Sequence, residues 1–282
     1  MFAFLNGKIL SEEKAKISPA DRGFLLGDGL FETMRSYSGK IFALEEHIER
    51  LFSSAKVFSL EIGYSEKELA QACDELLDAN KLKDARIRIT VSRGEFKGEL
   101  GLGWQSPSTV LITTKPLAER KSGEERLKLK KANFSLSEDY FFAKHKIVSY
   151  LPYLFAYDYA RKNGADDAVL FSCQGFLLEA SRANLFLVKD EVLKTPSLEL
   201  PLLAGITRKK ILEIARKLGI KVEEGKYRES ELVEADGVFL TNSVIELVPV
   251  LSYEGKIYSD KKAQELIKKL QDAYHQLVCP QF

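Results

Sequence analysis

The sequence contains few of the residues on which several common chemistries depend. It has three cysteines and three histidines among 282 residues, with no CxxC pair and no cysteine–histidine spacing typical of metal ligands. No metal site is therefore expected. Sparse, odd-numbered cysteines favour a reducing, cytoplasmic compartment. The sequence also lacks GxSxG and HExxH motifs, which argues against two classes of hydrolase.

An excess of charge and long apolar runs are absent as well. The chain has 42 basic and 41 acidic residues, so its formal net charge is +1. No apolar stretch approaches the roughly 18 residues of a membrane helix, and the N-terminal residues lack the charged and apolar regions of a signal peptide. We therefore expect neither nucleic acid nor a membrane among the partners of this protein.

The periodicity of the apolar residues predicts an α/β (α+β) protein. Asn6-Gly7 indicates a hairpin turn, and Ser65 with Glu68 forms a capping box before an amphipathic helix. The polar, turn-rich stretch 116–124 predicts a linker. We expect a small α+β domain over 1–115 and a larger α/β domain over 125–282.

Helices are expected at 44–57, 66–79, 150–163, 206–218 and 260–277. Strands are expected at 2–5, 8–10, 32–37, 40–43, 85–92, 109–114, 126–134, 168–171, 185–189, 221–223 and 237–240. Ser259 is the expected N-cap of the last helix. The glycine-rich stretches 23–29 and 98–103 do not match a dinucleotide fingerprint, and we interpret them as turns and loops.

Two segments contain residues suited to covalent or anion chemistry. Lys146 lies beside Lys144, whose like charge would favour the neutral, nucleophilic amine in a dry site. The plainer interpretation is an exposed basic patch. In residues 203–207, Gly205 and Thr207 open a periodic helix, whose free N–H groups could bind an anion. An ordinary N-cap by Thr207 is the alternative.

Three further segments have two interpretations each. Residues 241–243 could form a phosphate nest after a strand, or a β-turn built on Asx and serine groups. Glu179, which follows two leucines, could hold a proton on a ring nitrogen, or be solvated or paired. Arg50 could clamp a phosphate, or form a surface pair with Glu46.

The order and spacing of these segments resemble the fold-type IV pyridoxal-phosphate family over about residues 5–250. This family contains branched-chain aminotransferases, D-amino-acid aminotransferases and 4-amino-4-deoxychorismate lyases. The resemblance is specific for the family and poorly specific within it. It rests on residues 21–23, 27–33, 47–51, 146–150, 179–186, 203–207 and 241–250.

The resemblance implies that pyridoxal 5'-phosphate binds in the cleft between the two domains of the chain. It also implies that the protein forms a homodimer. Lys146 would be the Schiff-base lysine and would also move the substrate proton. Glu179 would pair with the pyridine nitrogen, which keeps the ring electron-withdrawing. Tyr150 would bond the phenolic oxygen of the cofactor. The resemblance also implies further cofactor-binding residues, namely Arg50, Leu203, Gly205, Ile206, Thr207, Asn242 and Ser243.

The substrate is less well defined. Phe31 and Thr33 correspond to residues that line the site, and Arg88, Arg93 and Lys97 are candidates to bind the substrate carboxylate. Surface charge is their alternative interpretation.

The motif set is mixed between the activities of the family. Thr33 and residues 241–243 resemble the lyases, whereas Glu246 and residues 149–151 resemble the aminotransferases. An arginine–x–histidine pair typical of the D-amino-acid enzymes is missing from this part of the sequence. We predict a transaminase for a branched-chain-like amino acid and a 2-oxo acid. The alternatives are a lyase releasing 4-aminobenzoate and pyruvate, a D-amino-acid aminotransferase, and a non-catalytic protein on the same scaffold.

Overall fold

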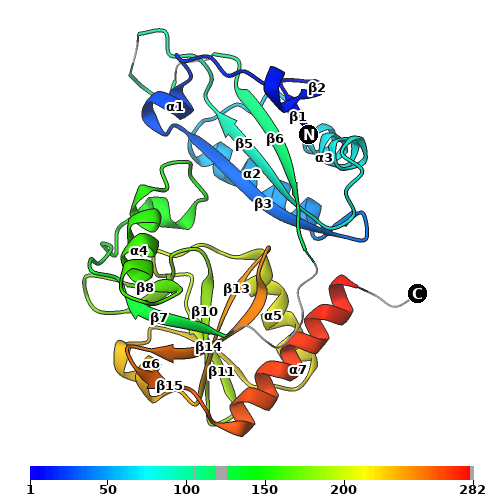
Figure 1. Cartoon of the computed structure of the whole chain (residues 1–282). Helices are drawn as coiled ribbons and strands as arrows, with labels where there is room; N and C mark the ends of the chain where they lie inside the picture. Colours follow the sequence, from blue (N-terminus) through cyan, green and yellow to red (C-terminus); the bar gives the residue numbers. More distant parts are fainter. Residues whose placement is uncertain (99, 104–105, 119–125, 280–282) are drawn as a thin grey trace. The chain divides into compact units, whose positions relative to one another are not determined.

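A computed structural model describes residues 1–98, 100–103, 106–118 and 126–279 (Figure 1). The chain divides into two compact units. The N-terminal unit is Met1–Glu119 with His145–Ser149, and the C-terminal unit is Arg120–Lys144 with Tyr150–Phe282. Most of the expected linker, from residue 119 onward, lies outside the described residues, so the predicted domain boundaries stay predictions. The predicted mixture of helices and strands is confirmed.

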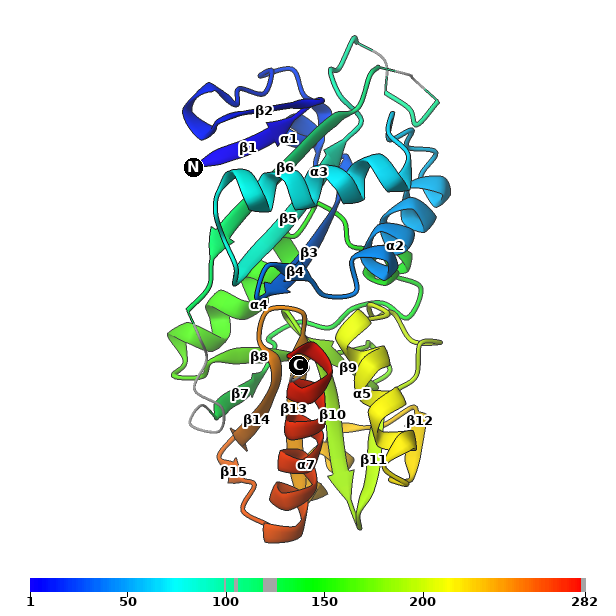
Figure 2. The ribbon, with the colours of Figure 1, turned by 90° about the vertical axis from the view of Figure 1, so that its right-hand side faces the viewer.

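The described part of the N-terminal unit contains a six-stranded antiparallel sheet of order β2-β1-β6-β5-β3-β4. Two amphipathic helices, α2 and α3, pack on one face and bury an apolar core with it (Figure 2). The strands are β1 Phe2–Leu5, β2 Lys8–Ser11, β3 Gly29–Tyr37, β4 Lys40–Ile41, β5 Ala85–Ser92 and β6 Thr109–Pro116. The helices are η1 Glu12–Lys14, α1 Arg22–Leu26, α2 Leu44–Val57 and α3 Glu66–Ala79.

The described part of the C-terminal unit contains a nine-stranded mixed sheet of order β12-β11-β10-β13-β14-β7-β8-β9, with β15 paired to β14. The sheet curls, so that β9 also contacts β10. Helices α5 and α7 pack on β13, and α4 packs on β8 (Figure 2). The strands are β7 Leu127–Lys131, β8 Asp167–Phe171, β9 Leu177–Ala180, β10 Asn184–Lys189, β11 Val192–Pro196, β12 Val222–Gly225, β13 Gly237–Asn242, β14 Glu246–Tyr253 and β15 Lys256–Ile257. The helices are η2 Phe141–Lys144, α4 Leu151–Lys162, α5 Ile206–Lys217, α6 Glu229–Glu234 and α7 Lys261–Val278.

Two local predictions are corrected by the structure. Residues 23–29 are not merely a turn, because Asp21 accepts a hydrogen bond from the Gly23 N–H and starts the short helix α1. Gly27 ends this helix with a left-handed φ of 68°. The N-cap of α7 is Asp260, which accepts from the Ala263 N–H at 2.9 Å, and not Ser259. Within the described ranges, no helix combines the length and the apolar character needed to cross a membrane.

Candidate functional site

Lys146 is held against the start of β3 in the N-terminal unit. The Phe31 N–H donates to the Lys146 carbonyl at 2.9 Å, and the Val148 N–H donates to the Gly29 carbonyl at 2.9 Å. These bonds explain why His145–Ser149 groups with the N-terminal unit, although its sequence position suggested the C-terminal domain. The lysine backbone is therefore fixed by a short ladder, which is a rigid support for a reactive side chain.

Four of the predicted residues lie together on one face of this sheet. The Lys146 Nζ lies 4.5 Å from the centre of the Phe31 ring, and the Arg88 guanidinium lies 3.8 Å from the same ring. Thr33 is opposite Arg88 in the ladder between β3 and β5. Lys97 is exposed on the loop after β5. The face thus presents an amine and a guanidinium beside one aromatic ring, and the guanidinium is suited to bind a substrate carboxylate.

Arg50 forms an ion pair with a buried carboxylate, Glu32. Its Nε and Nη2 donate to the two oxygens of Glu32 at 2.7 and 2.8 Å, and Glu32 also bonds the His47 Nδ1 at 2.8 Å. Burial acts to raise the pKa of Glu32, but the charge of Arg50 and the hydrogen bonds from His47 and Arg50 hold it well below its usual value. The bidentate pair fixes the plane of the Arg50 guanidinium.

The buried His47 predicts a pH-dependent stability. Burial lowers the pKa of His47, although Glu32 acts to raise it, so the folded chain keeps the ring neutral. The unfolded chain takes up a proton near pH 6.5, and stability therefore falls as the pH decreases through that value. We expect the free energy of unfolding to fall by about 1 kcal/mol more between pH 7.5 and 5.5 in the wild type than in a His47→Asn variant. Urea unfolding at the two pH values measures this difference, and equal losses in both proteins would contradict it.

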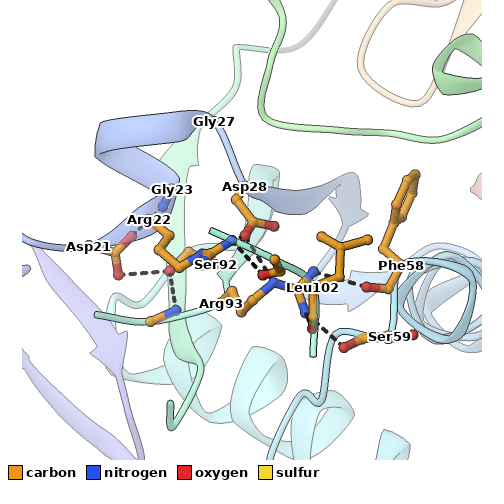
Figure 3. A network of polar contacts seen from close by, with 12 residues as sticks. Asp21, Arg22, Gly23, Gly27, Asp28, Phe58, Ser59, Ser92, Arg93 and Leu102 are labelled. Carbon is orange, nitrogen blue, oxygen red and sulfur yellow. Dashed lines mark hydrogen bonds and ion pairs between the residues drawn. The ribbon is translucent and has the colours of Figure 1, made fainter. Parts of the chain in front are cut away.

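Arg93 belongs to a separate buried network, which Figure 3 shows. Asp28 accepts from the Arg22 Nε at 2.7 Å and from the Arg93 Nε at 2.9 Å. Arg93 also donates to the carbonyls of Phe58 and Ser59 at the end of α2, and it is 4% exposed. The surface-charge interpretation of Arg93 is therefore wrong. The Arg93 guanidinium already donates to groups within the N-terminal unit. Arg88 and Lys97 therefore remain the stronger candidates for carboxylate binding.

In the C-terminal unit, Glu179 is a buried carboxylate at the end of β9. It is 5% exposed and accepts from the Asn184 Nδ2 at 3.1 Å and from the Leu203 N–H at 3.4 Å. The Asn184 Nδ2 also donates to the Leu203 carbonyl at 2.8 Å. A Cβ on Gly205 would lie 1.9 Å from the Asn184 Oδ1, so this position requires glycine. Asn184 thus ties Glu179 to residues 203–205. In the sequence, Asn184 is a single amide residue at the start of an apolar strand, and this pattern does not indicate its role.

Tyr150 lies at the N-cap of α4, and its hydroxyl donates to the Ser181 carbonyl at 2.8 Å. Its ring stacks on that of Tyr153 with centres 4.9 Å apart. Burial and the charge of Glu179 raise the pKa of Tyr153, which keeps its hydroxyl protonated. Sequence reasoning did not single out Tyr153, because a tyrosine at helical spacing is more often part of a core. The C-terminal unit thus gathers a phenol and a carboxylate.

The start of α5 has the properties of an anion site. Gly205 is the N-cap, so the prediction of an N-cap by Thr207 is wrong, and in the described structure no side chain caps this end. Thr207 is 2% exposed. The Thr241 Oγ1 is buried, and the described residues offer it no hydrogen-bond partner. The N–H groups of a helix start that no side chain caps, with the Thr207 hydroxyl in the first turn, are typical of phosphate sites.

The turn that contains Ser243 follows β13 directly. The Asn242 Oδ1 accepts from the N–H groups of Val244 and Ile245 at 2.9 and 2.8 Å, which is the Asx geometry expected as the plainer interpretation. This turn fixes the backbone around Ser243 directly after β13.

The predicted residues fall into two sets, one in each unit. Lys146, Arg50, Phe31, Thr33, Arg88 and Lys97 are in the N-terminal unit. Tyr150, Glu179, Leu203, Gly205, Ile206, Thr207, Asn242 and Ser243 are in the C-terminal unit. Together they supply an amine, a buried carboxylate, a phenol and phosphate donors, and this chemistry fits pyridoxal phosphate.

Comparisons with known proteins agree on one family. The model of the family described as amino-transferase class IV matches residues 29–253. A Methanocaldococcus jannaschii protein provisionally named a branched-chain-amino-acid aminotransferase is 36% identical over 280 residues, covering 97% of this chain and 95% of that protein. The aminodeoxychorismate lyase of Bacillus subtilis is 32% identical over 267 residues, covering 93% and 89%. The D-alanine aminotransferase of Bacillus licheniformis is 29% identical over 278 residues, covering 97% and 95%.

Solved structures give the same result. The branched-chain amino acid aminotransferase of Escherichia coli superposes with a TM-score of 0.92 at 27% identity, covering 98% of this chain and 94% of that one. The branched-chain aminotransferase of the archaeon Thermoproteus uzoniensis, solved with norvaline, has a TM-score of 0.90 at 29% identity, covering 99% and 94%. A further branched-chain amino acid aminotransferase, solved with pyridoxamine 5'-phosphate, has a TM-score of 0.91 at 28% identity, covering 98% and 93%. The predicted two-unit α/β fold is thereby confirmed.

Proposed function

The chain belongs to the amino-transferase class IV family, and from this membership we propose that it transfers an amino group between a branched-chain-like amino acid and a 2-oxo acid, with pyridoxal 5'-phosphate as cofactor. One observation carries the cofactor assignment: a buried carboxylate, Glu179, is joined through Asn184 to the uncapped start of α5. A carboxylate and an anion site joined in this way are the two partners that the ring nitrogen and the phosphate of a phosphorylated pyridine require.

Each set of residues has a separate task in this proposal. When bound, the cofactor would supply an aldehyde that bonds amines and a pyridinium ring that withdraws electrons. The N–H groups of Ile206 and Thr207 would bind its phosphate with the hydroxyl of Ser243, and Arg50 would add a guanidinium held in plane by Glu32. Leu203 would pack on the ring.

The proton chemistry is assigned to three side chains. The Glu179 carboxylate would hold a proton at the pyridine nitrogen, and the Tyr150 hydroxyl would bond the phenolic oxygen. The Lys146 Nζ would form the covalent attachment and take the proton from the substrate α-carbon. The substrate would be oriented by its carboxylate, for which the Arg88 guanidinium beside Phe31 is the best-placed described cation.

Assembly and location are part of the same proposal. We propose a homodimer by resemblance to the family. A cytoplasmic location is supported by the low and odd number of cysteines in the sequence, which is three.

The choice among the family's reactions is tested by half-reaction spectra. We expect L-leucine to convert the bound cofactor to its aminated form and 2-oxoglutarate to reverse the change. D-Alanine should react far more slowly, because the arginine–x–histidine pair expected of D-amino-acid enzymes is missing from the sequence. If no amino acid gives this conversion and aminodeoxychorismate yields 4-aminobenzoate, the protein is the lyase instead. The 32% identity to the Bacillus subtilis lyase is the observation that favours this second candidate.

A further inference from the structure

Asp167 is a buried carboxylate to which the sequence analysis assigned no role. It is the first residue of β8 and is 2% exposed. Its Oδ1 accepts from the N–H of Ala168 at 2.8 Å, from the N–H of Ser181 at 3.2 Å and from the Ser181 hydroxyl. Its Oδ2 accepts from the Arg182 Nε at 3.3 Å. Asp167 therefore holds both central residues of the turn between β9 and β10.

Two carbonyl groups of this turn accept hydrogen bonds from residues that are assigned to the cofactor, Tyr150 and Asn242. The Ser181 carbonyl accepts from the Tyr150 hydroxyl at 2.8 Å. The Arg182 carbonyl accepts from the Asn242 Nδ2 at 2.9 Å, while the Asn242 Oδ1 closes the turn that contains Ser243. Through this turn, Asp167 thus supports both the Tyr150 hydroxyl and the turn that contains Ser243.

The two hydrogen bonds to the turn fix the orientation of the Tyr150 hydroxyl and of the Asn242 amide. The Tyr150 hydroxyl donates its proton to Ser181, so its lone pairs point to other partners. If the Ser181 carbonyl moved, the direction of the Tyr150 proton would no longer be fixed. If the Arg182 carbonyl moved, the Asn242 amide would lose the anchor of its NH₂ group. The Arg182 side chain, which lies 4.0 Å from the Tyr157 ring, gives the turn a further contact.

We propose that Asp167 is a positioning residue for the cofactor: through Ser181 it orients the Tyr150 hydroxyl, and through Arg182 it anchors the Asn242–Ser243 turn. This inference deepens the proposed function and rests on it. The contacts on which it is built all lie within the C-terminal unit.

The first test is cofactor affinity in Asp167→Ala, measured by titrating the apo-protein with pyridoxal 5'-phosphate. We expect the dissociation constant to rise about 10- to 100-fold, as when a group behind a metal ligand is removed. Asp167→Asn keeps an acceptor for the Ser181 donors and should restore most of the affinity. The matched control is Asp236→Ala, which loses a carboxylate bonded to Lys189 and to the Asp190 N–H in the same sheet. It should stay within about twofold of the wild type.

A double-mutant cycle separates positioning from general destabilisation. Tyr150→Phe should weaken cofactor binding less in the Asp167→Ala background than in the wild type, because the tyrosine is already misdirected there. Equal losses in both backgrounds would overturn the inference, as would unchanged affinity in a folded Asp167→Ala protein. If Asp167→Ala does not fold, Ser181→Ala takes its place in the cycle, since it removes the hydroxyl that bonds Asp167.

Amide hydrogen exchange in the apo-protein tests the same inference without cofactor. Exchange at Val244 and Ile245 should accelerate about tenfold or more in Asp167→Ala but not in Asp236→Ala. If the wild type does not bind pyridoxal 5'-phosphate, the proposed function fails, and exchange at these amides still decides whether Asp167 positions the turn. Unchanged exchange would overturn that part of the inference.

Discussion

A Lys146→Ala variant is expected to fold normally and to lose turnover by a factor of at least about 10³–10⁴. Removal of a general acid–base group alone costs about 10²–10⁴-fold, and this side chain would also provide the covalent attachment. The fold should survive, because the ladder to Phe31 and Gly29 uses backbone atoms of this segment that alanine retains. Initial rates of amino transfer, with thermal unfolding as the folding check, measure both parts of the prediction.

Lys144→Ala is the matched control for this experiment. Lys144 is an exposed lysine only two residues away, and its Nζ donates to the Glu199 carbonyl at 3.3 Å. We expect nearly unchanged turnover in this variant, because Lys144 is exposed and bonded to Glu199 and does not provide the dry, like-charged setting that the sequence suggested for Lys146. Borohydride treatment should leave a covalent pyridoxyl adduct on Lys146 in the wild type and in Lys144→Ala. Undiminished turnover in Lys146→Ala, or an adduct on another lysine of the wild type, would refute the assignment.

Elements whose signals are local could be predicted from the sequence. Helix α3 begins and ends as predicted, because the Ser65–Glu68 capping box and the apolar positions of the helix lie within a few residues of one another. Helix α2 and strand β5 also have their predicted bounds. Strand β5 alternates buried and half-buried side chains over most of its length, which is the pattern of a sheet with one covered face.

Strands that depend on tertiary burial were missed. Strand β9 is buried at all four positions, so it shows no alternation by which a strand is identified. Strand β14 contains Pro249, which argues against a strand, and begins at Glu246 with a φ of 61°. These segments are strands because their neighbours in the sheet satisfy their backbone groups, and those neighbours are distant in the sequence.

The sequence identified most candidate site residues but not what holds them. Spacing and resemblance pointed to Arg50, whereas its carboxylate partner Glu32 lies 18 positions away and was not recognised. Asn184 and Asp167 were missed for the same reason, since a single polar residue in an apolar segment does not show which backbone groups it will meet. Supporting contacts are set by the fold, and they are therefore visible in the structure alone.

The second large effect is expected for Glu179→Gln, which replaces the carboxylate by a neutral group of the same shape. An amide cannot balance a proton on a ring nitrogen, so the ring would lose much of its electron-withdrawing character. Loss of one such electrostatic partner costs about 10²–10³-fold in kcat. The variant should still fold, because the glutamine oxygen can accept from the Leu203 N–H. The measurements are kcat and the absorption spectrum of the bound cofactor.

Glu179→Asp provides the comparison that isolates charge from geometry. Aspartate keeps the negative charge but shortens the reach by one methylene, so we expect partial activity and a spectrum nearer to that of the wild type. Cofactor affinity should change less than kcat in the glutamine variant, because the start of α5 and the Ser243 turn would still bind the phosphate. If Glu179→Gln retained full turnover, Glu179 would be a structural partner of Asn184 and nothing more. The ring proton would then need another carboxylate.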